Sequence, residues 1–223
     1  PVSILAKPVT LAASKTYDGS TSLSGAVTVG TGISGEALTY TGATVSDANV
    51  ATSSKFINTI MLADGTAGLA SNYRLPTLDH ANASASILAK PVTLAASKTY
   101  DGSTSLSGAV TVGTGINGEA LTYTGATASD VNVATSGNFI NAIVLADGTG
   151  GLASNYRLPI LDNTNAPVTI IPVPPVLVLP TQISSVAPVA APEVAAPAVA
   201  APEVAAPAAA APEVAAPAAA PAG

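Results

Sequence analysis

The sequence predicts an all-β fold: two tandem small domains of the β-sandwich type, immunoglobulin-like or related, followed by an extended tail rich in Pro and Ala. Three observations support this prediction. In the first 171 positions apolar and polar residues alternate, short apolar runs are separated by Gly, Asp, Asn and Ser, and a long segment occurs twice. Alternation with a period of about two residues is typical of strands, whereas helical patterns repeat about every 3.6 residues.

The repeat defines the domains. Residues 3–33 recur letter for letter as residues 86–116, at an offset of 83. Over the 81 positions from 3 to 83, 70 are identical to the residue 83 positions later. This period exceeds the roughly 20–50 residues of solenoid repeats and suits a small domain with its own core. We therefore expect repeat 1 at residues 6–88 and repeat 2 at residues 89–171, with the same fold and separately packed.

The two ends of the chain carry further information. Residues 1–5 align with residues 84–88 and 167–171, which end the two repeats. We therefore expect residues 1–5 to be the closing strand of a preceding repeat, and the chain to be a C-terminal piece of a longer protein. Residues 172–223 form the tail, with Pro every fifth residue from Pro192 to Pro217. Such a composition predicts a semi-stiff linker that does not pack on the repeats from about Val186 onward.

The strands follow in order along repeat 1. Val9, Leu11 and Ala13 alternate with Thr10 and Ala12 and predict the first strand. Further strands are expected at residues 26–29, 37–41, 56–62, 73–75 and 84–88, separated by turn sequences such as Asp-Gly and Ser-Gly. No stretch of ten residues has an amphipathic helical pattern. The expected core of each repeat consists of Leu11, Tyr17, Leu38, Ile60, Leu62 and Tyr73, and their equivalents Leu94, Tyr100, Leu121, Ile143, Leu145 and Tyr156.

The composition excludes several classes of site. Only 9% of residues are charged, the formal net charge is -6, and there is no Cys and one His. Without Cys there is no disulfide framework, zinc–thiolate site or thiol nucleophile. Seven basic residues spread along a mildly acidic chain leave no footprint for nucleic acid. We expect no enzyme activity, no catalytic residues, and no cofactor or metal site.

The acidic residues are interpreted first as turn residues. Asp18 in the sequence Tyr17-Asp18-Gly19 is expected to form a turn, with Tyr17 packed beneath it and its hydroxyl held by a hydrogen bond. Alternatively, Asp18 could bind Ca²⁺ or a sugar. The repeated acids are spaced too widely for the dense calcium-loop pattern, although a site could still assemble in space. They are Asp18, Asp47, Asp64 and Asp79, with equivalents Asp101, Asp130, Asp147 and Asp162.

Three other patterns are interpreted as structural features rather than as functional sites. A glycosidase pair of Glu36 and Asp47 is a minor alternative, because any two carboxylates in a small domain could pair. His80 has Asn163 as its equivalent and is expected on a surface loop. The sequence from Gly30 to Gly35 fits G-x-G-x-x-G, but no helix follows it, so a flexible hairpin is predicted rather than a phosphate site.

Three ordered motifs occur in both copies and resemble a known family. They are Lys15–Thr21, Asp47–Val50 and Gly68–Leu75, together with their equivalents 83 residues later. These residues resemble the YDG-type repeat, although Ala51 and Ala134 stand where the family often has Gly. The resemblance implies a β-rich module of large bacterial exoproteins similar to filamentous haemagglutinin adhesins. It also implies export through an outer-membrane secretion partner and a secreted or cell-surface location associated with the bacterial outer membrane.

Two functions are compatible with these expectations. The first is a structural stalk or repeat region of an adhesin-like exoprotein, which holds an active region of the parent protein away from the cell. The alternative is a module that itself binds a glycan or a protein of the host surface. No transmembrane segment is expected, because the apolar stretch at 167–180 is short and interrupted by five prolines.

Overall fold

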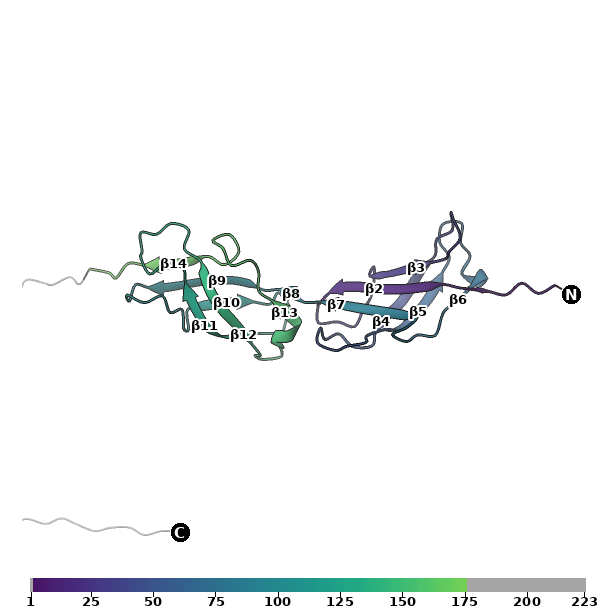
Figure 1. The fold of residues 1–223 in the computed structure, drawn as a ribbon, viewed down its shortest axis with the longest axis horizontal. Coiled ribbons are helices and arrows are strands. Elements are labelled where there is room, and N and C mark those ends of the chain that lie inside the picture. Colours follow the sequence, from purple (N-terminus) through teal and green to yellow (C-terminus); the bar gives the residue numbers. More distant parts are fainter. Residues whose placement is uncertain (1, 176–223) are drawn as a thin grey trace, which may run out of the picture. The chain divides into compact units, whose positions relative to one another are not determined.

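The computed structural model describes residues 2–175 of the chain (Figure 1). These residues form strands and two 3-10 helices, so the prediction of an all-β fold is confirmed. The described part holds no helix long and apolar enough to cross a membrane. Most of the predicted tail, including everything from Val186 onward, lies outside the described residues.

Repeat 1 contains seven strands and one 3-10 helix, at positions close to those predicted. The elements are β1 (Lys7–Pro8), β2 (Thr10–Thr16), β3 (Val27–Gly30), β4 (Thr39–Val45), β5 (Ile57–Ala63), η1 (Ala70–Asn72), β6 (Tyr73–Arg74) and β7 (Ala83–Leu88). Strand β2 lies between β3, to which it is antiparallel, and β7, to which it is parallel. Strands β4 and β5 form an antiparallel pair, and β1 pairs with β6 in parallel.

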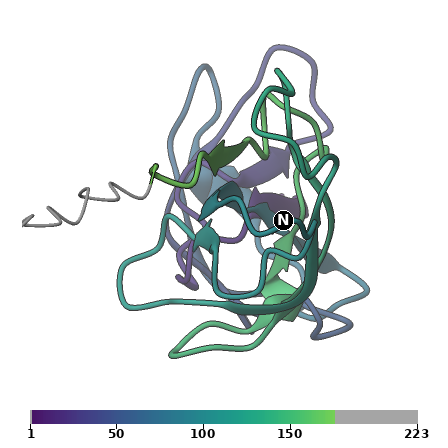
Figure 2. The same ribbon diagram turned by 90° about the vertical axis from the view of Figure 1, so that its left-hand side faces the viewer.

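Repeat 2 has the same elements in the same arrangement. They are β8 (Lys90–Pro91), β9 (Thr93–Thr99), β10 (Val110–Gly113), β11 (Thr122–Ala128), β12 (Ile140–Ala146), η2 (Ala153–Asn155), β13 (Tyr156–Arg157) and β14 (Val168–Ile171). The strand order β10-β9-β14 matches β3-β2-β7. Every ladder pairs strands of one repeat, so neither repeat completes a sheet of the other. Loops that join the strands project outward in Figure 2.

Parallel pairing, which was not among the expectations from the sequence, decides where the chain leaves repeat 1. Strands β2 and β7 run side by side in the same direction, with Thr16 opposite Leu88. Both strands therefore stop at the same end of the sheet, where the Tyr17 N–H donates to the Leu88 carbonyl at 2.8 Å. The turn that begins at Tyr17 consequently lies beside the point where the chain passes to repeat 2.

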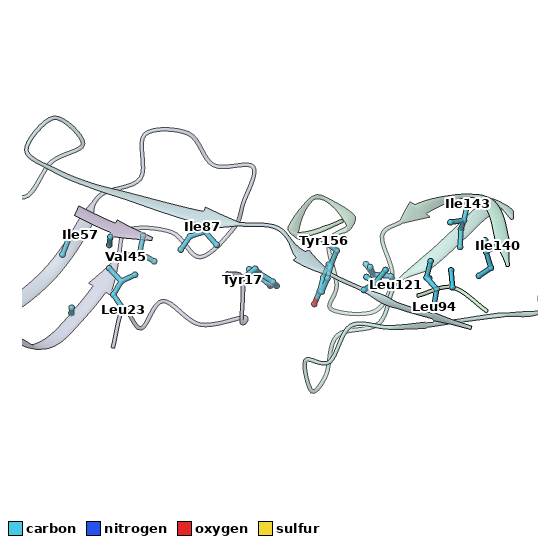
Figure 3. Close-up of a cluster of buried hydrophobic side chains, with 14 of the residues drawn as sticks. Tyr17, Leu23, Val45, Ile57, Ile87, Leu94, Leu121, Ile140, Ile143 and Tyr156 are labelled. Carbon is cyan, nitrogen blue, oxygen red and sulfur yellow. The ribbon is translucent and has the colours of Figure 1, made fainter. Parts of the chain in front are cut away.

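The core of each repeat is built from alternating positions of its strands. Leu11 and Ala13 of β2 are buried while the residues between them are exposed. Leu23 and Ile57 are fully buried in repeat 1, and Leu106 and Ile140 are fully buried at the equivalent positions. Figure 3 shows part of this buried cluster, with Leu23 and Ile57 in repeat 1 and Ile140 in repeat 2. Burying one such side chain contributes roughly 1.5–3 kcal/mol.

Three of the twelve predicted core residues need correction. Tyr100 is 40% exposed, whereas Tyr17 at the equivalent position is 7% exposed. The Tyr17 ring meets Tyr156 and its hydroxyl bonds to Glu119, both of repeat 2, whereas Tyr100 has no such cover among the described residues. Leu62 and Leu145, on the rim of the core, are half-buried rather than buried. The remaining nine predicted residues are in the buried core.

One loop of the fold is stabilised by different buried side chains in the two repeats. In repeat 1 the Lys55 ammonium donates to the carbonyls of Val50 and Thr52. In repeat 2 Asn138 replaces Lys55, and its amide donates to the Asp130 carbonyl at 2.8 Å. Both side chains are less than 10% exposed, and the loop carbonyls give their buried polar atoms the partners that such atoms require.

Candidate functional site: the junction between the repeats

The junction between the repeats is a direct contact with a very short connection. Only Ala89 separates β7 from β8, and its carbonyl accepts a hydrogen bond from Arg157 Nε at 3.3 Å. Strand β8 pairs with β13 so that Lys90 lies opposite Tyr156. Tyr17 and Tyr156 are therefore both placed next to the point where the chain crosses between the repeats.

The centre of the junction is formed by two tyrosines and one carboxylate. The rings of Tyr17 and Tyr156 meet edge to face, with centroids 5.6 Å apart (Figure 3). The Tyr17 hydroxyl donates to Glu119 Oε1 at 2.8 Å, and the Tyr156 hydroxyl donates to Glu119 Oε2 at 2.7 Å. Hydrogen bonds to a charged acceptor are shorter and stronger than those between neutral groups. Glu119 thus joins a phenol from each repeat through its two oxygens.

A second contact lies beside the first and is made by an asparagine. The Asn155 side chain accepts from the Val50 N–H at 2.8 Å and donates to Asn49 Oδ1 at 3.0 Å. Asn155 is 1% exposed, so its amide is satisfied almost entirely by repeat 1. A buried amide without partners would cost about 1–3 kcal/mol. This contact therefore favours one arrangement of the two loops.

A short loop holds Glu119 in place. The Thr114 hydroxyl donates to the Glu119 carbonyl at 2.8 Å, and the Ile116 N–H donates to the same hydroxyl at 3.3 Å. Lys90 Nζ donates to the Gly115 carbonyl at 3.0 Å. The equivalent loop of repeat 1 is the Gly30–Gly35 sequence. The Thr31 hydroxyl donates to the Glu36 carbonyl there, whereas Lys7 Nζ donates to the Thr31 carbonyl at 2.8 Å. These bonds fix a loop that was predicted to be a flexible hairpin, and the glutamate follows directly after it.

Burial and the Glu119 carboxylate both act on the two tyrosines. Burial raises the pKa of the Tyr17 phenol, and its hydrogen bond to Glu119 raises that pKa further. The same two causes, in the same order, raise the pKa of Tyr156. In repeat 1 the hydrogen bond to Glu36 is the main reason why the pKa of Tyr73 is raised. The phenols therefore stay protonated and act as donors across the ordinary pH range.

The Tyr-Asp-Gly turn also takes part in the junction. The Tyr17 hydroxyl was expected to be held by a hydrogen bond, and its partner is Glu119 of repeat 2. Gly19 also faces repeat 2: a Cβ there would lie 3.2 Å from Glu119 Oε1 and 3.3 Å from Ile116 Cγ2. At the equivalent Gly102 no heavy atom of the described residues, its chain neighbours aside, lies within 4 Å of that position.

The Asp residues of the two repeats bond to their own loops. Asp18 accepts from Lys15 Nζ at 2.6 Å and from the Ser20 N–H at 2.9 Å. Burial alone would raise the pKa of Asp18, but the hydrogen bonds from Lys15 and Ser20 hold it below its ordinary value. The other predicted acids likewise accept loop N–H groups; they are Asp47, Asp64, Asp79, Asp101, Asp130, Asp147 and Asp162. Among residues 2–175, no three His, Cys, Asp or Glu residues gather as a set that could hold a metal ion.

The remaining candidate residues, Glu36, Asp47 and His80, share no hydrogen-bond partner with one another. Glu36 accepts from the Tyr73 hydroxyl, while Asp47 accepts from the Asn49 N–H and the Thr52 hydroxyl, so the two carboxylates have separate partners. His80 is exposed, and its Nδ1 lies 3.1 Å from the Lys55 carbonyl oxygen. This surface-loop position is the one predicted for His80.

Each repeat also carries an open groove at the same place. The groove of repeat 1 has a volume of about 410 Å³ and is lined by residues that include Leu38, Tyr40 and Thr41. That of repeat 2 has about 420 Å³ and equivalent walls. The Tyr40 hydroxyl donates to the Leu23 carbonyl at 3.0 Å, and accepts from the Val27 N–H at 3.0 Å. Its polar end is therefore already satisfied within the fold.

Comparison with known proteins gives one family. Residues 2–83 match the YDG domain. No curated protein and no solved structure matches the chain. The matched segment of the YDG domain begins in the stretch that resembles a closing strand and stops where β7 begins. The strand that closes the sheet beside β2 therefore lies just after the end of the match.

The junction was not predicted from the sequence, although the necessary signal was present. Glu119 and Glu36 are the only Glu residues before the tail, and each stands at the same position of its repeat. A glutamate that recurs at one position, while the other acids of the repeat are Asp residues near turns, is a candidate for a specific contact. The sequence did not reveal the parallel pairing of β2 with β7, which places Tyr17 at the end of the sheet that faces repeat 2.

Proposed function

We propose that this chain is part of the repeat region of a secreted or surface-exposed bacterial exoprotein of the adhesin type. In this role each repeat is a small sandwich-like domain that adds length, and the junction between repeats limits how far they turn relative to each other. Export through an outer-membrane secretion partner and a location on the cell surface belong to the same proposal.

The observation that carries the proposal is the Tyr17–Glu119–Tyr156 contact. A chain whose domains only needed to be connected would have no use for a carboxylate that accepts from both repeats at 2.8 and 2.7 Å. The connection of one residue, Ala89, adds to the restriction. Most other ionisable side chains of the described residues form hydrogen bonds within loops and turns, as expected if the repeats serve as spacers.

The spacer proposal is tested by measuring the distance between spin labels. The chain has no Cys, so Thr28→Cys and Thr111→Cys would place one label on the exposed surface of each repeat. We expect a narrow distance distribution, broadened by Tyr17→Ala and unchanged by the matched control Tyr100→Ala. A broad distribution in the parent chain, as from two freely jointed domains, would contradict the proposal.

The groove that recurs in both repeats favours a second candidate, a glycan- or host-protein-binding module. Repetition would give such a module two equal sites and a gain in avidity. The exposed groove residues Thr41 and Thr124 can be changed to Arg without touching the junction. Specific binding on a glycan array or to host cells that is lost in this double variant would favour the module. Equal signals from both chains would argue against it.

A further inference from the structure

In the junction the Tyr17 turn of repeat 1 contacts Glu119 and Tyr156 of repeat 2, which we call the receiving side. The equivalent residues of repeat 1, Glu36 and Tyr73, already have the same arrangement. The Tyr73 hydroxyl donates to Glu36 Oε2, as the Tyr156 hydroxyl does to Glu119 Oε2. Tyr73 and Tyr156 are buried to the same extent, 6% and 5% exposed. Thr31 holds the Glu36 loop through its hydroxyl, as Thr114 holds the Glu119 loop. The receiving side thus forms without the turn that it receives.

The same end of repeat 1 exposes the groups that repeat 2 uses to bind repeat 1. Asn72 is exposed, whereas its equivalent Asn155 is fully buried against Asn49 and Val50. Ile33 is 44% exposed, whereas Ile116 is partly covered and faces Gly19. Glu36 Oε1 corresponds to the oxygen of Glu119 that accepts from Tyr17.

Every residue of the junction is identical in the two repeats. None of the positions 17, 19, 33, 36, 49, 50, 72 and 73 is among the eleven that differ over the 81 compared. The turn on one side and the receiving surface on the other are therefore present on each repeat. An interface between two different surfaces of the same unit can be repeated without limit.

The segment before repeat 1 supplies an independent observation. Val2 and Ile4 are 97% and 95% exposed. The equivalent residues that pair with β2 or β9 are covered: Ile87 is 4% exposed, Val168 and Ile170 are each 8% exposed, and Ala85 is partly buried. Alternating apolar side chains left in solvent are what the closing strand of a further repeat would look like without the strand beside it.

We propose that the end of repeat 1 formed by Glu36, Asn72 and Tyr73 is a docking surface for the Tyr-Asp-Gly turn of another YDG-type repeat, joined to it through residues 2–5. The occupant is a repeat in the same polypeptide, because a one-residue connection holds the turn at a high effective concentration beside its receiving surface. Residues 2–5 would then pair with the β2 strand of that repeat. The inference rests on the proposed spacer function and names the partner of its junction.

The test is a chain of three repeats, made by joining a copy of residues 7–83 to the front of the full chain. The fusion places Ala before Pro1, as Ala166 precedes Pro167 in the natural chain. Hydrogen exchange is measured at the Val50 N–H of the added copy, which should bond to Asn72 as the original Val50 bonds to Asn155. We expect protection in the two places to agree within about threefold.

The matched variants are Asn72→Ala and Asn155→Ala, each made in the two-repeat and in the three-repeat chain. Asn72→Ala should leave the thermal midpoint of the two-repeat chain unchanged, since Asn72 is exposed there. In the three-repeat chain it should speed exchange at the added Val50 by at least tenfold, and Asn155→Ala should do the same at the original Val50 in both chains. Val2 and Ile4 amides should also become protected in the three-repeat chain.

Two outcomes would overturn the inference. One is a three-repeat chain in which the original junction is protected but the added one exchanges freely. The other is association of separate two-repeat chains through Asn72 with no protection in the three-repeat chain. Failure of the spacer function is distinguishable, because it would appear as free exchange at the original Val50 as well.

Discussion

The strongest test of the junction is to remove one hydroxyl from each of two tyrosines that occupy the same position in their repeats. Tyr17→Phe deletes the donor to Glu119 and keeps the ring that meets Tyr156 edge to face. Tyr100→Phe makes the same chemical change where the ring is 40% exposed. Because the local sequence around the two tyrosines is identical, any effect within a single repeat is the same in both variants.

The expected magnitude follows from the geometry. A hydrogen bond to a charged group contributes about 1.5–3 kcal/mol to the free energy of unfolding. The Tyr17–Glu119 bond is 2.8 Å long but only partly buried, and Glu119 keeps its bond to Tyr156. We therefore expect about 1.5 kcal/mol from Tyr17→Phe, at the low end of that range. Tyr100→Phe, a surface change, should fall within about 0.5 kcal/mol of zero.

The assay is urea unfolding of the full chain, followed by far-ultraviolet circular dichroism. In a repeat protein the total stability is approximately the sum of the intrinsic stabilities and the interface between neighbours. A loss of interface energy therefore lowers the midpoint while the slope stays constant. Equal midpoints for Tyr17→Phe and Tyr100→Phe would refute the junction as an energetic contact, whatever their common shift from the parent chain.

Three further predictions use the same pairing of positions. Gly19→Ala and Gly102→Ala both place a side chain in the left-handed region, at φ 76° and 74°, and each should lower the free energy of unfolding by about 1–2 kcal/mol. In urea unfolding Gly19→Ala should lower it more than Gly102→Ala, because only the Cβ at position 19 meets repeat 2. Burial and the neighbouring carboxylate raise the pKa of Tyr17 in the folded state. The stability that the protonated phenol contributes is therefore complete below about pH 10 and is lost as the pH rises through the higher folded-state pKa. Tyr17→Phe should lose less free energy of unfolding than the parent chain in an alkaline titration. Lys55→Asn, which installs the side chain that repeat 2 has at Asn138, should change the thermal midpoint little, whereas Lys55→Met should cost about 1–3 kcal/mol by leaving loop carbonyls without a donor.

Most of each repeat could be predicted from the sequence, because it depends on local patterns. Alternation placed β2 around Leu11 and Ala13, and the identity of the copies required both repeats to have the same strands. The acids that form turns, such as Asp18 beside Gly19, follow from the preference of these residues for turns. Such features need only a few neighbouring residues, so one sequence suffices to infer them.

The junction could not be predicted, because it depends on pairing between distant strands. Tyr17 and Glu119 are 102 residues apart, and nothing local distinguishes Tyr17 from Tyr100. The same local sequence gives a buried ring at Tyr17, where a second repeat packs against it, and an exposed ring at Tyr100. A core assignment from residue type therefore succeeded at Tyr17 for the wrong reason and failed at Tyr100.

The perfect agreement of residues 3–33 with residues 86–116 has a genetic consequence when it is combined with the junction. Recombination between the two copies, wherever it occurs within the period, adds or removes 83 residues at a time. Each added unit brings one Tyr-Asp-Gly turn and one glutamate loop, in the order that the Tyr17–Glu119 contact requires. In the proposed spacer role, the length of the protein would therefore change by unequal crossing-over in whole repeats, and each new repeat would bring an interface that already fits its neighbour.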